Sequence, residues 1–187
     1  MLQLKISGEK NLFLRRFIIF ASKPMTTIMQ GKKKDIRIVP YEEKYKPFFQ
    51  KFNEEWITKY FELEDIDRRL FSDPYTYIIK PGGEIFTALV DGEPGGVCAL
   101  AISNNPAYDY ELEKLAVTPA MQGLGLGRLL VNAVIREARN RGGRTLYIET
   151  NTKLPPAIHL YESAGFKKIP LKETVFKRVD VEYVLDL

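Results

Sequence analysis

The chain has 187 residues, enough for one domain with a sizeable core, and its 45% apolar and 28% charged residues are an ordinary globular balance. Its one cysteine, Cys98, excludes an internal disulfide, and together with its one histidine, His159, it is too little for a structural zinc site. No apolar run approaches the roughly 20 residues that cross a bilayer. We therefore expect no metal and no membrane partner, and a cytoplasmic location fits this composition.

The basic character of the chain is confined to its beginning. Residues 1–34 hold eight of the 28 Lys and Arg and one of the 24 Asp and Glu, so the rest carries 20 basic and 23 acidic residues. A nucleic-acid surface needs basic residues clustered on the folded part, which argues against such a partner. The stretch Asn11–Ala21 has too short an apolar core for a signal peptide. We expect residues 1–34 to be a poorly ordered extension, with a docked strand or helix as the alternative, and residues 35–187 to be the folded domain.

The first half of the domain combines one strand, two helices and a hairpin. Alternating residues predict a strand over Asp35–Pro40. Apolar and aromatic residues at helical spacing predict an amphipathic helix from Glu42 to about Phe61, and a second short helix lies near Glu64–Phe71. Two strands, Ile85–Val90 and Gly96–Ile102, are joined by a hairpin turn.

The second half alternates strands and helices. The fourth strand, Tyr108–Val117, leads to a glycine-rich turn and a long helix, about Leu124–Arg141, whose apolar stripe includes Leu129. The remaining elements, in order, are a strand, a short helix and two strands, over Thr145–Glu149, Pro156–Ala164, Phe166–Lys168 and Val179–Leu185. This order implies an α/β domain with a mixed sheet.

The glycine-rich turn carries the clearest chemical signal. It reads Gln122-Gly123-Leu124-Gly125-Leu126-Gly127-Arg128. Glycines permit positive φ angles and remove Cβ atoms that would block a ligand. The unpaired N–H groups at a helix start, with the positive end of the helix dipole, favour a phosphate, and Arg128 adds a positive charge. The segment predicts a phosphate or pyrophosphate ligand, with a turn used only for tight packing as the alternative.

Two common phosphate motifs do not fit this turn. A P-loop needs Lys-Ser/Thr after its glycines, and a dinucleotide fingerprint needs a glycine where Arg128 stands. Glu149 mimics the ribose-binding acid of that fingerprint, but the chain after it is too short for a second βαβ half.

The spacing Gln122-x-x-Gly125-x-Gly127 instead resembles the acyl-CoA loop of the GNAT superfamily of N-acyltransferases. The segment Leu115-Ala116-Val117-Thr118-Pro119 stands where that superfamily has the strand leading into the loop, and Ala157–Phe166 is similar to its A-x-x-L-Y-x-x-x-G-F signature. One departure is Leu154, where these enzymes often have Asn.

The resemblance implies a mixed, mostly antiparallel sheet with helices on both faces, splayed between the fourth and fifth strands. It also implies acetyl-CoA as acyl donor, with its pantetheine arm between these strands and its pyrophosphate on the glycine turn. Asn151 could contact the arm in place of the missing Asn. The residues implied in donor binding are Leu115, Ala116, Val117, Gln122, Gly123, Leu124, Gly125, Leu126, Gly127, Arg128, Asn151 and Tyr161.

The same resemblance suggests catalytic roles. Tyr161, in the Leu-Tyr motif, is the candidate acid for the departing thiolate, with a packing aromatic as the alternative. Glu111 and Glu113 share one face of their strand unless a bulge intervenes, and either could be the base; a solvated strand acid is the alternative. His159 fits a helix surface better than a base. An acidic, aromatic lining for the acceptor could come from four residues of the N-terminal helices, Tyr60, Glu62, Glu64 and Asp67. The more ordinary alternative is that these residues form a solvated helix face.

The resemblance therefore implies an enzyme that moves an acetyl group from acetyl-CoA to an amine by direct attack in a ternary complex. A small-molecule amine is the favoured acceptor, and a protein lysine or N-terminus is the alternative. A third reading is a non-catalytic acyl-CoA sensor. Many members of the superfamily form homodimers, and the sequence leaves open whether this chain does.

Overall fold

The computed structural model describes residues 34–172 and 174–187. The predicted N-terminal extension, apart from Lys34, lies outside the described residues. Within the described ranges no helix is long and apolar enough to cross a membrane. The same ranges contain no group of three or more His, Cys, Asp or Glu side chains arranged to hold a metal ion.

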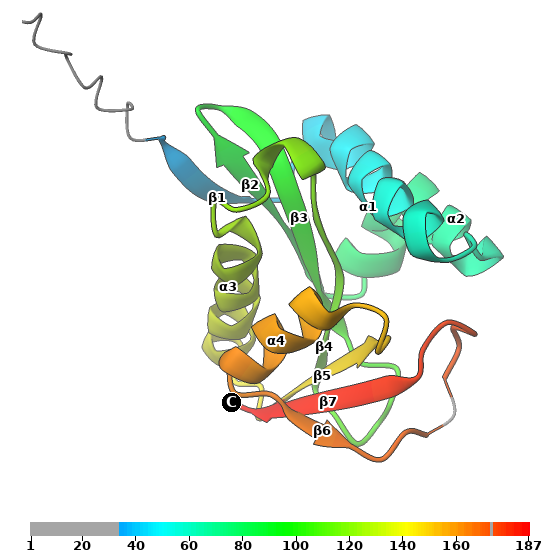
Figure 1. Cartoon of the computed structure of the whole chain (residues 1–187). Helices are drawn as coiled ribbons and strands as arrows, with labels where there is room; N and C mark the ends of the chain where they lie inside the picture. The colour runs from blue at the N-terminus through cyan, green and yellow to red at the C-terminus, as the bar shows by residue number, and fades with distance from the viewer. Residues whose placement is uncertain (1–33, 173) are drawn as a thin grey trace, which may run out of the picture. The chain divides into compact units, whose positions relative to one another are not determined.

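One seven-stranded sheet organises the domain, in the order β1-β2-β3-β4-β5-β7-β6 (Figure 1). Neighbouring strands are antiparallel except β4 and β5, which are parallel. The strands are β1 (Ile36–Pro40), β2 (Glu84–Val90), β3 (Glu93–Ile102), β4 (Tyr110–Val117), β5 (Thr145–Thr150), β6 (Lys167–Ile169) and β7 (Val181–Asp186). The mixed, mostly antiparallel sheet expected from the sequence is confirmed.

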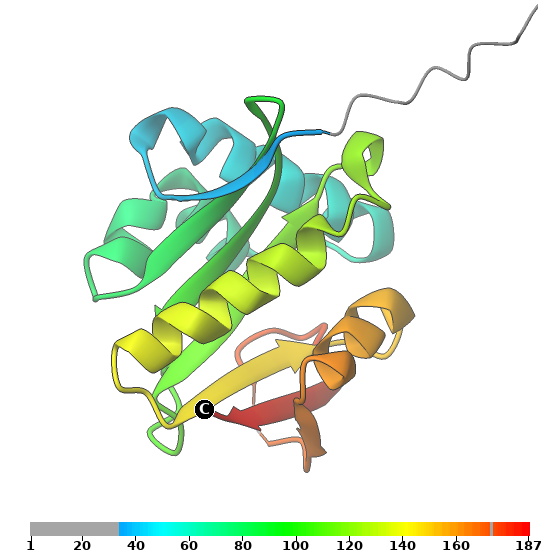
Figure 2. The ribbon, with the colours of Figure 1, turned by 90° about the vertical axis from the view of Figure 1, so that its left-hand side faces the viewer.

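Helices cover both faces of this sheet (Figure 2). One face carries α3 (Leu126–Asn140) and α4 (Pro155–Ser163), which share a core with strands β2 to β5 and β7. The other carries α1 (Lys46–Tyr60) and α2 (Asp65–Ser72), together with a π-helical turn over Tyr75–Ile79 that the sequence analysis did not predict.

The buried stripe of α3 is rotated from the predicted one. Leu130 and Val134 are fully buried as expected, but Leu129 is 40% exposed. Val131 and Ile135 are buried in addition, and at 100° per residue they move the centre of the stripe away from Leu129. The prediction that Leu129 packs in the core is therefore wrong.

A β-bulge interrupts β4 in the middle of the sheet. The register of β3 against β4 shifts between Val97 and Ala99, and Lys114, opposite, has a left-handed φ of 55°. Because of this extra residue the strand changes faces. Leu112 packs in the α3-side core, whereas Ala116, four residues further on, packs in the α1-side core.

The parallel strands β4 and β5 pair only at their beginnings, where Tyr110 faces Leu146 and Glu111 faces Tyr147. Beyond Glu111 the two strands separate, as the sequence predicted. The opened seam faces the ends of α1, α3 and α4, and it positions the candidate site.

Candidate active site

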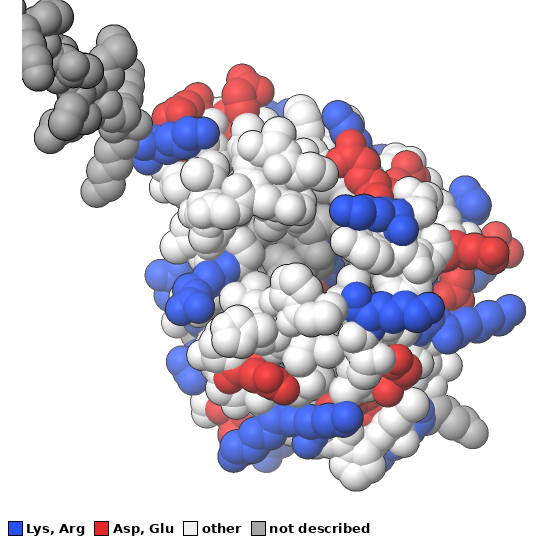
Figure 3. All heavy atoms as spheres, in the orientation of Figure 1, with Lys and Arg blue, Asp and Glu red and all other residues white. Residues whose placement is uncertain are grey.

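A cavity of about 440 Å³ fills the seam between β4 and β5. Its walls come from β4, the end of β5, the C-terminal end of α1 and the start of α4, with the β6–β7 loop closing one side. The space-filling view shows the surface hollowed here, with largely uncharged atoms around the hollow (Figure 3). The cavity thus occupies the place predicted for an extended acyl-CoA arm.

The glycine turn lies at one end of this cavity, where β4 gives way to α3. Gly123 and Gly125 have positive φ angles of 81° and 77°, and a Cβ added at either would meet no atom within 4 Å. The first helical N–H to bond is that of Leu129, to the carbonyl of Gly125. The amide groups just before it therefore have no helical partner and are free for an anion.

The third glycine of the turn has a packing role. A Cβ at Gly127 would lie 3.2 Å from Cδ2 of Leu160, so glycine allows α3 and α4 to approach closely. Gln122 and Gly127 line the cavity, while Arg128 is exposed on the first turn of α3. Gly123 and Gly125 thus fit the phosphate-binding interpretation of the turn, whereas Gly127 fits the tight-packing interpretation.

The strand segment predicted to bind the donor also lines the cavity. Leu115 and Val117 pack toward the α3 side, and Ala116 packs into the α1-side core. The carbonyl of Val117 accepts a hydrogen bond from Nε2 of Gln122 at 3.3 Å. This contact ties the glycine turn to the end of β4.

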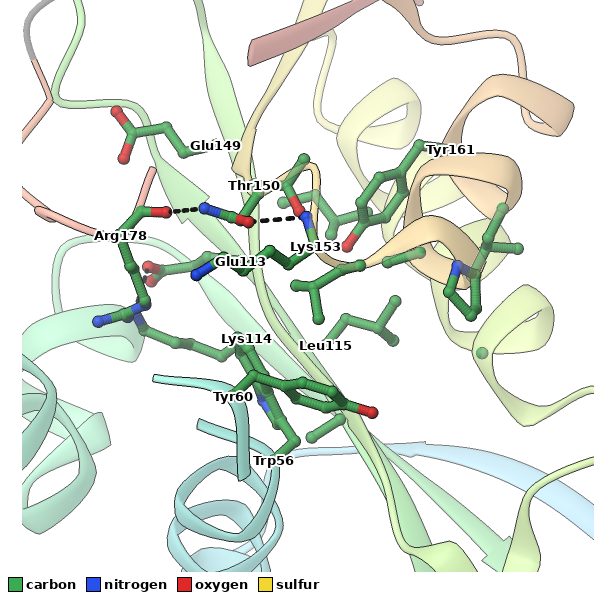
Figure 4. A pocket seen from close by; sticks show the side chains of 18 of the residues that line it. Trp56, Tyr60, Glu113, Lys114, Leu115, Glu149, Thr150, Lys153, Tyr161 and Arg178 are labelled. Carbon is green, nitrogen blue, oxygen red and sulfur yellow. Dashed lines mark hydrogen bonds and ion pairs between the residues drawn. The ribbon is translucent and has the colours of Figure 1, made fainter. Parts of the chain in front are cut away.

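Asn151 lies in the cavity wall with both ends of its amide occupied. Its Nδ2 donates to the carbonyl of Arg178, and its Oδ1 accepts from the N–H of Lys153 at 2.7 Å (Figure 4). Its own carbonyl accepts from the N–H of Leu154 at 3.0 Å. Asn151 therefore shapes the entry to α4 and joins it to the β6–β7 loop; its contact with an acyl-CoA arm stays a prediction.

Tyr161 of α4 is 6% exposed, and its ring packs edge-on against Phe166 at 6.0 Å between centroids. Its hydroxyl points into the cavity (Figure 4). Burial raises the pKa of this phenol above its ordinary value. The group therefore keeps its proton through the neutral range, as a proton donor to a thiolate requires.

Three carboxylates gather where β4 and β5 begin to separate. Glu111 and Glu113 lie on one face of β4 ahead of the bulge, and the parallel pairing puts Glu149 on the same face of β5. Glu149 accepts a hydrogen bond from the hydroxyl of Tyr147 at 3.2 Å, and it lies on the opposite side of the cavity from Tyr161 (Figure 4).

Burial raises the pKa of Glu111 well above its usual value, and the nearby charges of Glu113 and Glu149 add to this effect. Burial also raises the pKa of Glu149, opposed by the hydrogen bond from Tyr147. A carboxyl group with a raised pKa is a stronger base once ionised, so either group can take a proton from an amine.

The sequence analysis missed Glu149 as a site residue because it considered it only as a mimic of a ribose-binding acid. The signal was present in the alternation Tyr147-x-Glu149 beside Glu111-x-Glu113, since neighbouring parallel strands in register place such residues on one face.

A second cavity, of about 710 Å³, opens on the other side of these carboxylates. It lies between α2, the π-helical turn, the end of β3 and the β6–β7 loop. Glu111, Glu113, Glu149 and Phe176 line both cavities. The two cavities therefore meet at the carboxylate cluster.

A buried ion-pair network closes the remaining side. Asp67 of α2 is fully buried and accepts two hydrogen bonds of 2.7 Å from the guanidinium of Arg178. Nζ of Lys114, the bulge residue, lies 3.5 Å from Asp67 and 3.7 Å from Glu113. Both cations pack on the ring of Phe176, at 4.2 Å for Lys114 and 4.4 Å for Arg178. The network fixes the β6–β7 loop against α2.

This network corrects the predicted acceptor lining. Glu64 and Asp67 both form ion pairs with the guanidinium of Arg178, Glu64 at 2.9 Å. They therefore form neither an open acidic wall nor a solvated helix face. Glu62 is exposed and lines neither cavity, and Tyr60 lines the seam cavity. His159 is exposed on α4, as expected of a helix-surface residue.

A sheet that opens between two parallel strands, with a positive-φ glycine turn at its open end and carboxylates at the other, has the architecture expected of an N-acyltransferase. The comparison with known families agrees. The model of the Acetyltransferase (GNAT) family matches residues 42–166, so the chain belongs to that family.

Curated relatives match parts of the chain. The chain is 33% identical over 76 residues to N-alpha-acetyltransferase RimI of Mycobacterium tuberculosis, covering 41% of this chain and 46% of that protein. It is 35% identical over 86 residues to the [Ribosomal protein bS18]-alanine N-acetyltransferase of Escherichia coli, covering 46% of this chain and 58% of that protein. The chain thus spans about half the length of these relatives.

Solved structures share the fold. A GNAT-family acetyltransferase from Staphylococcus aureus superposes with a TM-score of 0.72 at 19% identity, covering 81% of this chain and 99% of its own. The yncA protein of Salmonella typhimurium, solved with acetyl-CoA and described there as a putative acetyltransferase, has a TM-score of 0.64 at 20% identity, covering 81% and 93%.

Proposed function

We propose that this chain is an acetyl-CoA-dependent N-acetyltransferase that joins its two substrates in a ternary complex. The observation that carries the proposal is the meeting of two cavities at one carboxylate cluster, Glu111, Glu113 and Glu149. One cavity follows the opened strand seam and ends at the glycine turn, and the other opens to the opposite side. Such an arrangement lets donor and acceptor bind together without a covalent enzyme intermediate.

The residues of the seam fit acetyl-CoA. The amides that follow Gly123 are unpaired by the helix, and the absence of Cβ atoms at Gly123 and Gly125 leaves space against the backbone for a pyrophosphate. Backbone groups of Leu115 to Val117, which line the seam, would pair with the amide groups of the pantetheine arm and polarise the thioester carbonyl. The related fold solved with acetyl-CoA supports this placement.

The carboxylates and Tyr161 provide the two proton transfers. Glu111, directly or through a water, takes a proton from the acceptor ammonium, whose pKa is roughly 10 for a lysine-like amine. The amine nitrogen then forms a bond with the thioester carbon and loses its second proton to water, and the carbon–sulfur bond breaks. Tyr161 gives a proton to the departing thiolate, and solvent restores it. Glu113, paired with Lys114, and Glu149 hold the negative potential that attracts the ammonium.

For the acceptor, the second cavity supports a small-molecule amine, because its volume falls in the range of roughly 300–1,000 Å³ that is usual for small-ligand sites. A protein N-terminus is the second candidate, favoured by the relatives named for N-alpha and ribosomal-protein alanine acetylation.

The test is release of free thiol from acetyl-CoA across a panel of simple amines, amino acids and peptides with free N-termini or lysines, with calorimetric binding of acetyl-CoA as the control. Turnover of one class establishes the enzyme and its acceptor class. Tight acetyl-CoA binding without any turnover would favour the sensor, and absence of binding would refute the assignment of the seam and its glycine turn.

A further inference from the structure

The mouth of the second cavity carries exposed apolar side chains. Tyr77 of the π-helical turn is 50% exposed, Ile102 at the end of β3 is 42% exposed, and Val175 in the β6–β7 loop is 68% exposed, and all three line this cavity. Single exposed apolar residues are ordinary on a protein surface, but a cluster of them at a cavity indicates a ligand.

The convergence of these residues is specific to this cavity. Seven large apolar side chains are exposed in the described part of the chain, and three of them meet here from segments far apart in the sequence. Ile66 and Leu70 of α2 continue the apolar wall inward. The cavity therefore offers apolar side chains beside the polar Arg69, Asn104 and Asn105.

The inner end of the cavity is anionic. Glu113 is partly neutralised by Lys114 at 3.7 Å, whereas Glu111 and Glu149 form no salt bridge with any described residue. Charge complementarity favours an ammonium group beside them. Arg69 is the one cationic residue among those that line this cavity, and it would repel a second ammonium. A single positive charge on the acceptor fits this distribution better than a polyamine.

The β6–β7 wall of the cavity is anchored to α2. The Arg178–Asp67 hydrogen bonds of 2.7 Å hold the β6–β7 loop, which carries Val175 and Phe176, against α2. The apolar wall is therefore formed before an acceptor binds, and apolar contact on that wall is gained without ordering a loop.

We propose that the acceptor is a small primary monoamine with an apolar alkyl or aryl body, whose ammonium lies beside Glu111 and Glu149 and whose body lies against Tyr77, Ile102 and Val175. The proposal rests on the proposed function and names the substrate class of the same site. On this proposal a diamine, a free amino acid and a lysine side chain are poorer substrates than such a monoamine.

The test measures kcat/KM for a series of straight-chain alkylamines and phenylalkylamines, beside diamines, amino acids and lysine peptides. We expect kcat/KM to rise about three- to fourfold for each methylene that reaches the apolar wall. Tyr77→Ala should flatten this rise and lower kcat/KM of the longest amines several-fold more than that of the shortest amine. The matched control is Tyr75→Ala, because Tyr75 is 54% exposed, lies two residues away and does not line the cavity.

Several results would overturn the inference. These are a chain-length dependence that is flat in the wild type, an equal effect of the Tyr75→Ala and Tyr77→Ala variants, or a preference for diamines, amino acids or peptides. In each of these cases thiol release persists, and the proposed function stands. Failure to bind acetyl-CoA, or binding without turnover of any amine, would refute both. Unchanged acetyl-CoA affinity of both variants shows that they are folded.

Discussion

The fully buried carboxylate of Asp67 offers the sharpest test of how the site is held together. It faces the guanidinium of Arg178 through two hydrogen bonds of 2.7 Å and Nζ of Lys114 at 3.5 Å. The side chains of these two cations are only 12% and 5% exposed. Replacing Asp67 by Asn keeps the shape but removes the one negative charge that contacts both of them.

The expected loss of stability follows from this burial. Removing one partner of a buried ion pair typically costs about 3–5 kcal/mol, and Glu64 beside Arg178 and Glu113 beside Lys114 compensate the two cations only in part. For a domain of this size each kcal/mol lowers Tm by about 2–4 °C, so Asp67→Asn should lower Tm by about 6–20 °C. The acceptor KM should rise as well, because the released β6–β7 loop carries Phe176 away from the carboxylates.

Thermal and urea unfolding of the wild type and variant measure this loss. The matched control is Asp65→Asn, since Asp65 is exposed in the same first turn of α2 and should cost no more than about 1 kcal/mol through the helix dipole. In a double-mutant cycle, Asp67→Asn with Arg178→Gln should lose less than the sum of the single losses. Equal losses for Asp65→Asn and Asp67→Asn would refute the argument that the network stabilises the site.

Three further predictions concern the chemistry. Glu111→Gln should lower kcat. Because the pKa of Glu111 is raised in the folded protein, its protonated form stabilises the fold at low pH, and this contribution is lost as the pH rises through the folded pKa. The Tm of the variant relative to that of the wild type should therefore rise from pH 5 to pH 8. A Tm difference that stays constant with pH would contradict the raised pKa. Tyr161→Phe should lower kcat and leave the acetyl-CoA Kd unchanged by calorimetry, and an unchanged kcat would assign the ring a packing role. Gly125→Ala should lower the free energy of unfolding by about 1–2 kcal/mol, because Gly125 has a φ of 77°, and should weaken acetyl-CoA binding at least tenfold. The matched control is Gly142→Ala, since Gly142 has a φ of 78° and equally open space at the other end of α3. It should lose the same stability and leave acetyl-CoA binding intact.

The fold was largely predictable because local patterns determine most of it. Alternation identified the first strand, turn residues identified the β2–β3 hairpin, apolar spacing identified α1 and α3, and three motifs in order predicted the splay between β4 and β5. The error at Leu129 arose because a helical stripe was read from apolar residues alone. Leucine at the edge of a stripe satisfies the same spacing as leucine at its centre, and only packing distinguishes them.

The site was predictable where it depends on the local chain and not where it depends on contacts between distant segments. Motifs located the glycine turn and Tyr161, and the shared strand face located Glu111 and Glu113; the structure places them at the cavity, and their chemical roles stay predictions. Asp67 and Arg178 lie 111 residues apart, and neither has a local pattern that identifies the other. A charged residue on a short helix is ordinarily solvated, so its complete burial follows only from the tertiary structure.

The bulge at Lys114 explains how one strand serves two cavities. In a regular strand Glu111, Glu113, Leu115 and Val117 would all face one side of the sheet. The extra residue turns Leu115 and Val117 toward α3 and the seam, while Glu111 and Glu113 stay on the side of the second cavity. It also directs the Lys114 side chain to Asp67 and Phe176, so the residue that separates the two sites also stabilises the loop that closes them. The left-handed backbone of Lys114, with its φ of 55°, thus lies beside a buried ion pair that its own side chain forms.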